Sequence, residues 1–184
     1  HAATVNSPTR LCIGGGTAPP ASPTNIIDFV EIATTGNATD FGDMSAARDM
    51  YASASSSTRG TFMAGKTPTY LTVIDYITIS SQGNAVDFGN LTVGRFETDA
   101  VSNGTRAVWG GGKFSSTITD TIDYVEFRSK GNAADFGNLT AARHKFGACS
   151  TSTRGVWGGG QTPTTVNTID YVTIASVGNA SDFG

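Results

Sequence analysis

The chain has 184 residues and a formal net charge of −3; 15% of its residues are charged and 23 are glycine. This length is compatible with one domain. The acidic balance argues against nucleic-acid binding, which needs a basic face. The lack of a run of about 18 apolar residues argues against membrane insertion. A chain this rich in Gly, Ser and Thr is typical of turn-rich, all-β proteins outside the cell or on a particle surface.

The chain is built from an internal repeat. The phrase Gly-Asn-Ala-x-Asp-Phe-Gly occurs four times at a spacing of about 47 residues, beginning at Gly36, Gly83, Gly131 and Gly178. A period of about 40 to 50 residues indicates a stack or ring of equivalent units. Each unit is too small to bury its own apolar face, so the units pack on one another. We expect one repeat domain over residues 1–184, with units at approximately 1–42, 43–89, 90–137 and 138–184.

Further markers keep the same step. A Thr-Arg pair recurs in every unit, and an arginine follows the Asp-Phe-Gly phrase at Arg48, Arg95 and Arg143. Recurrence in separate units indicates a structural role, and partly buried charges persist only when they are paired. We therefore expect these arginines to pair with one of two sets of recurring aspartates. The first set is Asp28, Asp75, Asp123 and Asp170, and the second is Asp40, Asp87, Asp135 and Asp182.

Each unit is predicted to form four short strands. In the fourth unit these cover residues 144–150, 155–160, 168–176 and a last strand that opens at 181. The third strand has apolar residues on both faces, which suits a strand between neighbouring sheets. Clusters of Gly, Asn, Pro and Ser separate the strands and favour turns. No stretch shows a 3.6-residue apolar period, so helices should be minimal.

Four strands per unit of about 47 residues is typical of a β-propeller blade. The order of motifs is an apolar strand, a Gly-Gly pair, a variable loop, Ile169-Asp170-Tyr171, Phe183 and Leu-Thr-Ala-Ala-Arg. It resembles the kelch repeat, except that phenylalanine stands where kelch blades usually have tryptophan. The resemblance implies an all-β, kelch-like propeller of four blades. Since the chain starts at His1 and stops in mid-unit, we expect a closed four-bladed ring or part of a larger one. A parallel β-solenoid is the structural rival.

Phrases such as Thr-Arg-Gly-Val-Trp-Gly-Gly-Gly, from Thr153, also resemble tandem repeats in virion and tail-associated proteins of marine bacteriophages, cyanophages especially. This resemblance implies a non-catalytic structural or adhesin-like protein, located on a virion or outside the cell. Its expected partners are other virion or fibre subunits and a host-surface glycan or protein. The alternatives are an extracellular glycan-active propeller enzyme and an intracellular kelch scaffold for protein interactions.

The sequence offers no catalytic, metal or cofactor motif. Only two histidines occur, and a surface role suits His144 better than catalysis. HExxH, CxxC and GxSxG are absent, and the glycine runs lack the Lys-Ser/Thr pair of a phosphate loop. We expect Cys12 and Cys149 to be free thiols, with a disulfide as the alternative if the first and fourth units meet.

The variable loops are the best candidates for binding. They lie between the glycine run and the Ile-Asp strand and differ between units while their surroundings repeat, and such loops often form the binding face of repeat proteins. By kelch topology they share a face with the turns before three of the recurring arginines. The predicted binding residues are Lys66, Tyr70, Lys113, Phe114, Arg48, Arg95 and Arg143.

Overall fold

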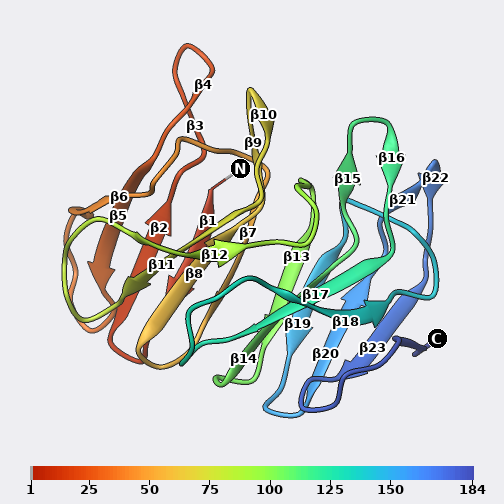
Figure 1. Ribbon diagram of the computed structural model, residues 1–184. Helices are drawn as coiled ribbons and strands as arrows, with labels where there is room; N and C mark the ends of the chain where they lie inside the picture. The colour runs from red at the N-terminus through yellow and green to blue at the C-terminus, as the bar shows by residue number, and fades with distance from the viewer. Residues whose placement is uncertain (1) are drawn as a thin grey trace.

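The computed structural model describes residues 2–184, so His1 lies outside the described residues. It contains four antiparallel sheets of four strands each, in the order of the chain (Figure 1). The first is β1 (Ala3–Asn6), β2 (Arg10–Gly14), β5 (Ile26–Glu31) and β6 (Thr39–Asp43). The second is β7 (Ala52–Ser55), β8 (Arg59–Met63), β11 (Val73–Thr78) and β12 (Val86–Asn90). The third is β13 (Asp99–Ser102), β14 (Arg106–Gly110), β17 (Thr121–Glu126) and β18 (Ala134–Asn138). The fourth is β19 (Gly147–Ser150), β20 (Arg154–Gly158), β23 (Ile169–Thr173) and β24 (Ser181–Asp182).

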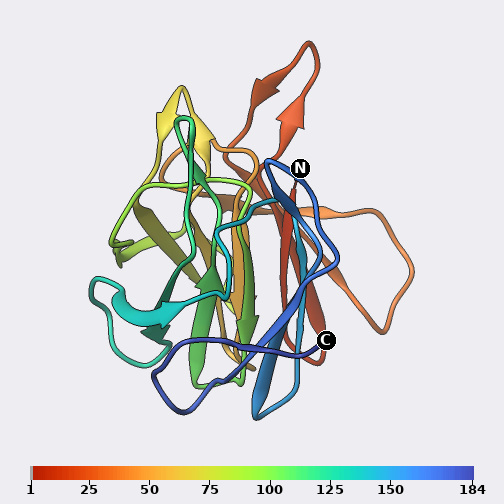
Figure 2. The same ribbon diagram turned by 90° about the vertical axis from the view of Figure 1, so that its right-hand side faces the viewer.

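The prediction of an all-β chain with repeated four-stranded units is confirmed, and the sheets are consistent with propeller-like blades. The first strands of the sheets pack side by side in the sequence β1, β7, β13 and β19. They therefore form the inner edge of the assembly, and the later strands of each sheet fan outward (Figure 2). No helix long and apolar enough to cross a membrane occurs in residues 2–184.

Each variable segment forms a short hairpin, which the sequence did not predict. The four hairpins are β3 (Thr17–Ala18) with β4 (Ser22–Pro23), β9 (Lys66–Thr67) with β10 (Thr69–Tyr70), β15 (Lys113–Phe114) with β16 (Thr117–Ile118), and β21 (Gln161–Thr162) with β22 (Thr164–Thr165). All four project from the same end of the molecule, at the top of Figure 1. One end of the molecule therefore carries all four variable segments.

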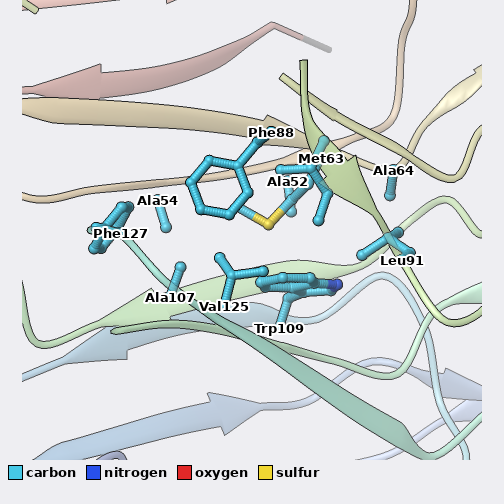
Figure 3. Packing of buried hydrophobic residues seen from close by; sticks show 11 residues of the cluster. Ala52, Ala54, Met63, Ala64, Phe88, Leu91, Ala107, Trp109, Val125 and Phe127 are labelled. Atoms are coloured by element: carbon cyan, nitrogen blue, oxygen red, sulfur yellow. The ribbon is translucent and has the colours of Figure 1, made fainter. Parts of the chain in front are cut away.

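The core lies between the sheets. Figure 3 shows the junction of the second and third sheets, where Met63 and Phe88 face Trp109 and Val125. Trp109 is fully buried there. Corresponding clusters fill the junctions of the first sheet with the second and of the third with the fourth. This confirms the expectation that the apolar face of each unit is buried by its neighbour.

A bulge recurs where the third strand of a sheet meets the fourth. The register shifts between Ile27 and Asp28, between Ile74 and Asp75, and between Ile122 and Asp123. A bulge bends the strand and changes the direction of the side chain beside it. In the second and third sheets the aspartate at this position is fully buried, and its arginine partner lies in the loop that leads into that sheet.

Candidate functional site

A cluster of aromatic and basic side chains covers the projecting face between the second and third units. We call Lys66, Tyr70, Phe96, Lys113 and Phe114 the hairpin surface. The ring of Tyr70 stacks on Phe96, with centroids 5.4 Å apart and an interplanar angle of 15°. It meets Phe114 edge-on, also at 5.4 Å. Phe96 is almost completely buried, whereas Phe114 is 45% exposed.

The backbone holds the hairpin surface together. Phe96 and Lys113 exchange two main-chain hydrogen bonds, with N–H to O distances of 3.0 and 2.9 Å. The Lys66 ammonium lies 5.8 Å from the Tyr70 ring centroid and 5.6 Å from that of Phe96, which is within cation–π range. The arrangement is an ordered, partly exposed aromatic platform with positive charge at its edge.

The structure brings together four of the predicted binding residues, Lys66, Tyr70, Lys113 and Phe114, and adds Phe96. The sequence did not single out Phe96, because the same position holds Asp49 and His144 in other units. These three residues make the same backbone bridge in their units. A change of side chain at a position where the backbone repeats was the signal that could have pointed to Phe96.

The three predicted arginines lie elsewhere, inside the junctions between units. Arg48 pairs with Asp75 at 2.6 Å, Arg95 with Asp123 at 3.1 Å and Arg143 with Asp170 at 3.0 Å, and all six side chains are 0% exposed. They therefore have no surface with which to contact a partner. All three aspartates belong to the first of the two candidate sets, so the second set provides no partner for these arginines.

Each of these aspartates also accepts a hydroxyl hydrogen bond. Ser45 donates to Asp75 at 2.8 Å, and Thr92 and Thr140 hold the equivalent places in the next two junctions. Desolvation lowers the pKa of Arg95. It also raises the pKa of Asp123, although the Arg95 charge and the Thr92 hydrogen bonds act in the opposite direction. The buried Arg–Asp pairs therefore stabilise the packing of the sheets and do not form a binding surface.

A second candidate site is a pocket of about 530 Å³ beside the starts of the inner strands, which residues of all four units line. We call it the axial pocket. Three lining residues at equivalent positions, Met50, Glu97 and Lys145, have φ angles of 55°, 55° and 57°. Such backbone is uncommon for residues other than glycine and concentrates at functional sites. Main-chain N–H groups link them, from Glu97 to Met50 and from Lys145 to Glu97.

The axial pocket carries titratable groups that do not recur. Glu97 Oε2 lies 2.7 Å from His144 Nδ1, and Glu97 Oε1 lies 3.6 Å from the Lys145 ammonium. Asp99 accepts N–H hydrogen bonds from Ala100 and from Ala148 of the next unit, and burial raises its pKa. Sequence reasoning missed this cluster, since Glu97 and Asp99 lie more than 40 residues from His144 and Lys145 in the chain and each stands out only as a departure from the repeat.

The other sequence candidates are simpler. Cys12 is buried and Cys149 is exposed, and both are free thiols. Burial raises the pKa of Cys12 to about 11. Among residues 2–184, no group of three or more His, Cys, Asp or Glu side chains is placed to hold a metal ion.

No protein-family model matches the chain, and no curated protein sequence has significant similarity to it. Function is therefore inferred from the geometry of the hairpin surface and the axial pocket.

Proposed function

We propose that the protein is a non-catalytic, kelch-like β-propeller that acts as a structural or receptor-binding element. In this proposal it is an adhesin-like component of a phage virion or tail fibre, located on the virion or outside the cell. Its blades form a complete ring of four or part of a larger ring. Its partners are a host-surface glycan or protein and neighbouring virion or fibre subunits.

The hairpin surface is the observation that carries this proposal. The sheets repeat, but the hairpins differ, and in repeat proteins the varied loops of one face often bind the partner. Tyr70 and Phe114 are rigid, large and partly exposed, which is typical of residues that dominate binding energy. An aromatic face attracts the positively polarised C–H edges of a ligand, and a sugar ring presents such an edge.

The charge of the hairpin surface favours the same class of ligand. Lys66 and Lys113 give it a local positive charge on a chain whose net charge is −3. An anionic or hydroxyl-rich group on a host glycan would meet the ammonium groups while its apolar face covers the rings. A neighbouring subunit with an acidic loop would suit the same surface.

The proposal is tested by attachment of the purified protein to candidate host cells and to a glycan array. We expect Tyr70→Ser with Phe114→Ser to weaken attachment by about tenfold or more, as loss of central aromatic contacts does elsewhere. Phe183→Ser is the matched control, since Phe183 is 54% exposed but lies outside the hairpin surface. Unchanged attachment by a double variant that melts like the native protein would refute the proposal.

One observation favours a second candidate, an extracellular glycan-active propeller enzyme. Glu97 and Asp99 line the axial pocket, and His144 contacts Glu97. A pair of acidic residues carries out most glycoside hydrolysis. Incubation of the glycans that bind in the attachment assay tests this candidate. Cleavage that is abolished by Asp99→Asn or Glu97→Gln would establish that the protein is an enzyme. Glycans that stay intact would favour the binding protein of the first proposal.

A further inference from the structure

One arginine has the same surroundings in all four units. The Thr-Arg arginine begins the second strand of each sheet and lies over the aromatic ring of the third strand. The guanidinium carbon is 4.4 Å from the ring centroid of Phe29, Tyr124 and Tyr171, and 4.9 Å from that of Tyr76. Stacking on a ring orients the guanidinium plane and leaves the N–H groups at its edge free to bond. The repeat therefore presents the same fork of donors in every unit.

In the first and third sheets a glutamate occupies this fork. Glu31 Oε1 accepts hydrogen bonds from Arg10 Nε at 2.8 Å and from Arg10 Nη2 at 2.5 Å. Glu126 Oε1 lies 2.8 Å from Arg106 Nε and 2.6 Å from Arg106 Nη2. Each glutamate stands directly opposite its arginine across the strand pair. These two sheets show how the repeat holds an oxyanion.

The second sheet has the fork without the glutamate. Thr78 stands opposite Arg59, and this threonine is exposed. Arg59 Nη1 donates to the carbonyl of Phe127, as Arg10 and Arg106 do to the equivalent carbonyls. Among residues 2–184, Arg59 Nε and Nη2 have no hydrogen-bond acceptor, and no carboxylate pairs with this arginine. The donors that bind a carboxylate in the first and third sheets are therefore open to solvent here.

Two further basic residues gather beside Arg59. The Lys130 ammonium lies 5.0 Å from the Tyr76 ring centroid, and Arg128 directly follows Phe127. Both residues are exposed, and neither has a carboxylate partner in the described chain. No other unit has a basic residue at either position. The neighbouring acid in the sequence is already neutralised by Arg106. We call the resulting cluster the Arg59 site, and it consists of Arg59, Tyr76, Thr78, Arg128 and Lys130.

We propose that the Arg59 site binds a phosphate monoester group, with one phosphate oxygen in the place that the glutamate oxygen takes in the first and third sheets. A phosphate monoester carries a charge of about −1.5 to −2 at neutral pH. Arginine bonds to phosphate through the same paired N–H groups as to carboxylate. In the first and third sheets one arginine meets one carboxylate, whereas the Arg59 site offers three positive charges to a single group.

The same cluster is a poor match for a nucleic-acid backbone. Such a backbone has one charge per phosphate and is bound by many cations along its length. The Arg59 site is one compact cluster on a chain with a net charge of −3. A terminal phosphate, such as that of a phosphorylated sugar, fits it better. The site is also separate from the hairpin surface, because Arg59 begins β8 and the hairpin β9–β10 follows the other end of that strand.

Calorimetric titration at low salt with inorganic phosphate and with glucose 6-phosphate tests the proposal. We expect Thr78→Glu to weaken the binding of both by about tenfold or more, because the new carboxylate takes the fork as Glu31 does. This variant keeps the contact of Arg59 with Phe127, so its melting temperature should not fall. Lys130→Gln should weaken binding too, and added salt should weaken it in the native protein, because exposed charges are screened.

The fourth sheet supplies the matched control. Thr173 stands opposite Arg154 as Thr78 stands opposite Arg59, so Thr173→Glu makes the same change of charge away from the Arg59 site. It should leave phosphate binding unchanged. Tighter binding of glucose 6-phosphate than of inorganic phosphate would identify a phosphorylated sugar as the ligand, and equal binding would assign recognition to the phosphate alone.

Three results would overturn the proposal. The first is an absence of saturable phosphate binding by the native protein. The second is an equal loss in Thr78→Glu and Thr173→Glu, which would show attraction by overall charge alone. The third is binding that is lost in Lys66→Gln with Lys113→Gln but kept in Thr78→Glu, which would place the phosphate at the hairpin surface. Because the two sites are separate, failure at the Arg59 site would leave the proposed function intact.

Discussion

Replacement of Arg95 by methionine should destabilise the protein strongly. The change keeps much of the side-chain volume but leaves the Asp123 carboxylate buried without its counter-charge. Removal of one partner of a buried pair typically costs about 3–5 kcal/mol. The Thr92 hydroxyl still bonds to Asp123 at 2.8 Å, so we expect the lower end, about 3 kcal/mol. At about 2–4 °C per kcal/mol for a chain of this length, the melting temperature should fall by roughly 6–12 °C.

The pH dependence identifies the cause. The pKa of Asp123 is already above its ordinary value of 3.8 because of desolvation, and loss of Arg95 raises it further. A group with a raised folded-state pKa favours the folded state fully below its unfolded pKa, and this contribution is lost as pH rises through the folded pKa. The destabilisation relative to the native protein should therefore be largest at neutral pH and should shrink as pH falls toward 3.8.

Urea unfolding at pH 7 and near pH 4 measures both effects. Lys145→Met is the control, since Lys145 is half exposed, its contact with Glu97 is 3.6 Å long, and methionine occupies the equivalent backbone position at Met50. Its cost should be below about 1 kcal/mol. A cost below about 1 kcal/mol for Arg95→Met, or an equal cost at both pH values, would refute the role given to the buried pair.

Two other predictions concern single residues. In the native protein, Cys149 should react readily with a thiol reagent. Cys12 should stay protected, because it is buried and burial raises its pKa to about 11. Equal labelling of both thiols would contradict the packing between the first and second sheets. Gly89→Ala should cost at least about 2 kcal/mol, because its φ is +150° and a Cβ would lie 2.2 Å from the carbonyl oxygen of Gly131. Gly36→Ala is the control, because a Cβ there would meet nothing within 4 Å, and it should change the free energy of unfolding by less than about 0.5 kcal/mol. Denaturant unfolding measures both variants. Equal costs for Gly89→Ala and Gly36→Ala would contradict the close approach of Gly89 to Gly131.

The repeat period made the architecture predictable. A four-times repeated pattern of short strands and turns leaves few ways to bury apolar residues such as Trp109, and the sheets pack accordingly. The hairpins were not predicted, since two-residue strands such as Lys66–Thr67 leave no periodic pattern. Which aspartate meets Arg48 depends on the placement of one unit against the next, and no local pattern encodes that placement.

The candidate sites show the same division. Tyr70 and Phe114 were predicted because they interrupt the repeat in its variable loops. Arg48 and its equivalents were assigned to the same face, yet their recurrence reflects a buried structural role. Glu97 and His144 come from positions that face each other only after two units have packed, so their meeting was not readable from the chain.

Hydrogen exchange of the protein, alone and with a bound glycan or host-surface extract, tests the central claim most directly. We expect protection on binding to concentrate in the hairpins β9–β10 and β15–β16, with little change in the loops around Gly83 and Gly131. Protection concentrated at the start of β13, beside Asp99 and the axial pocket, or in those outer loops would contradict the claim that the hairpin surface is the binding site.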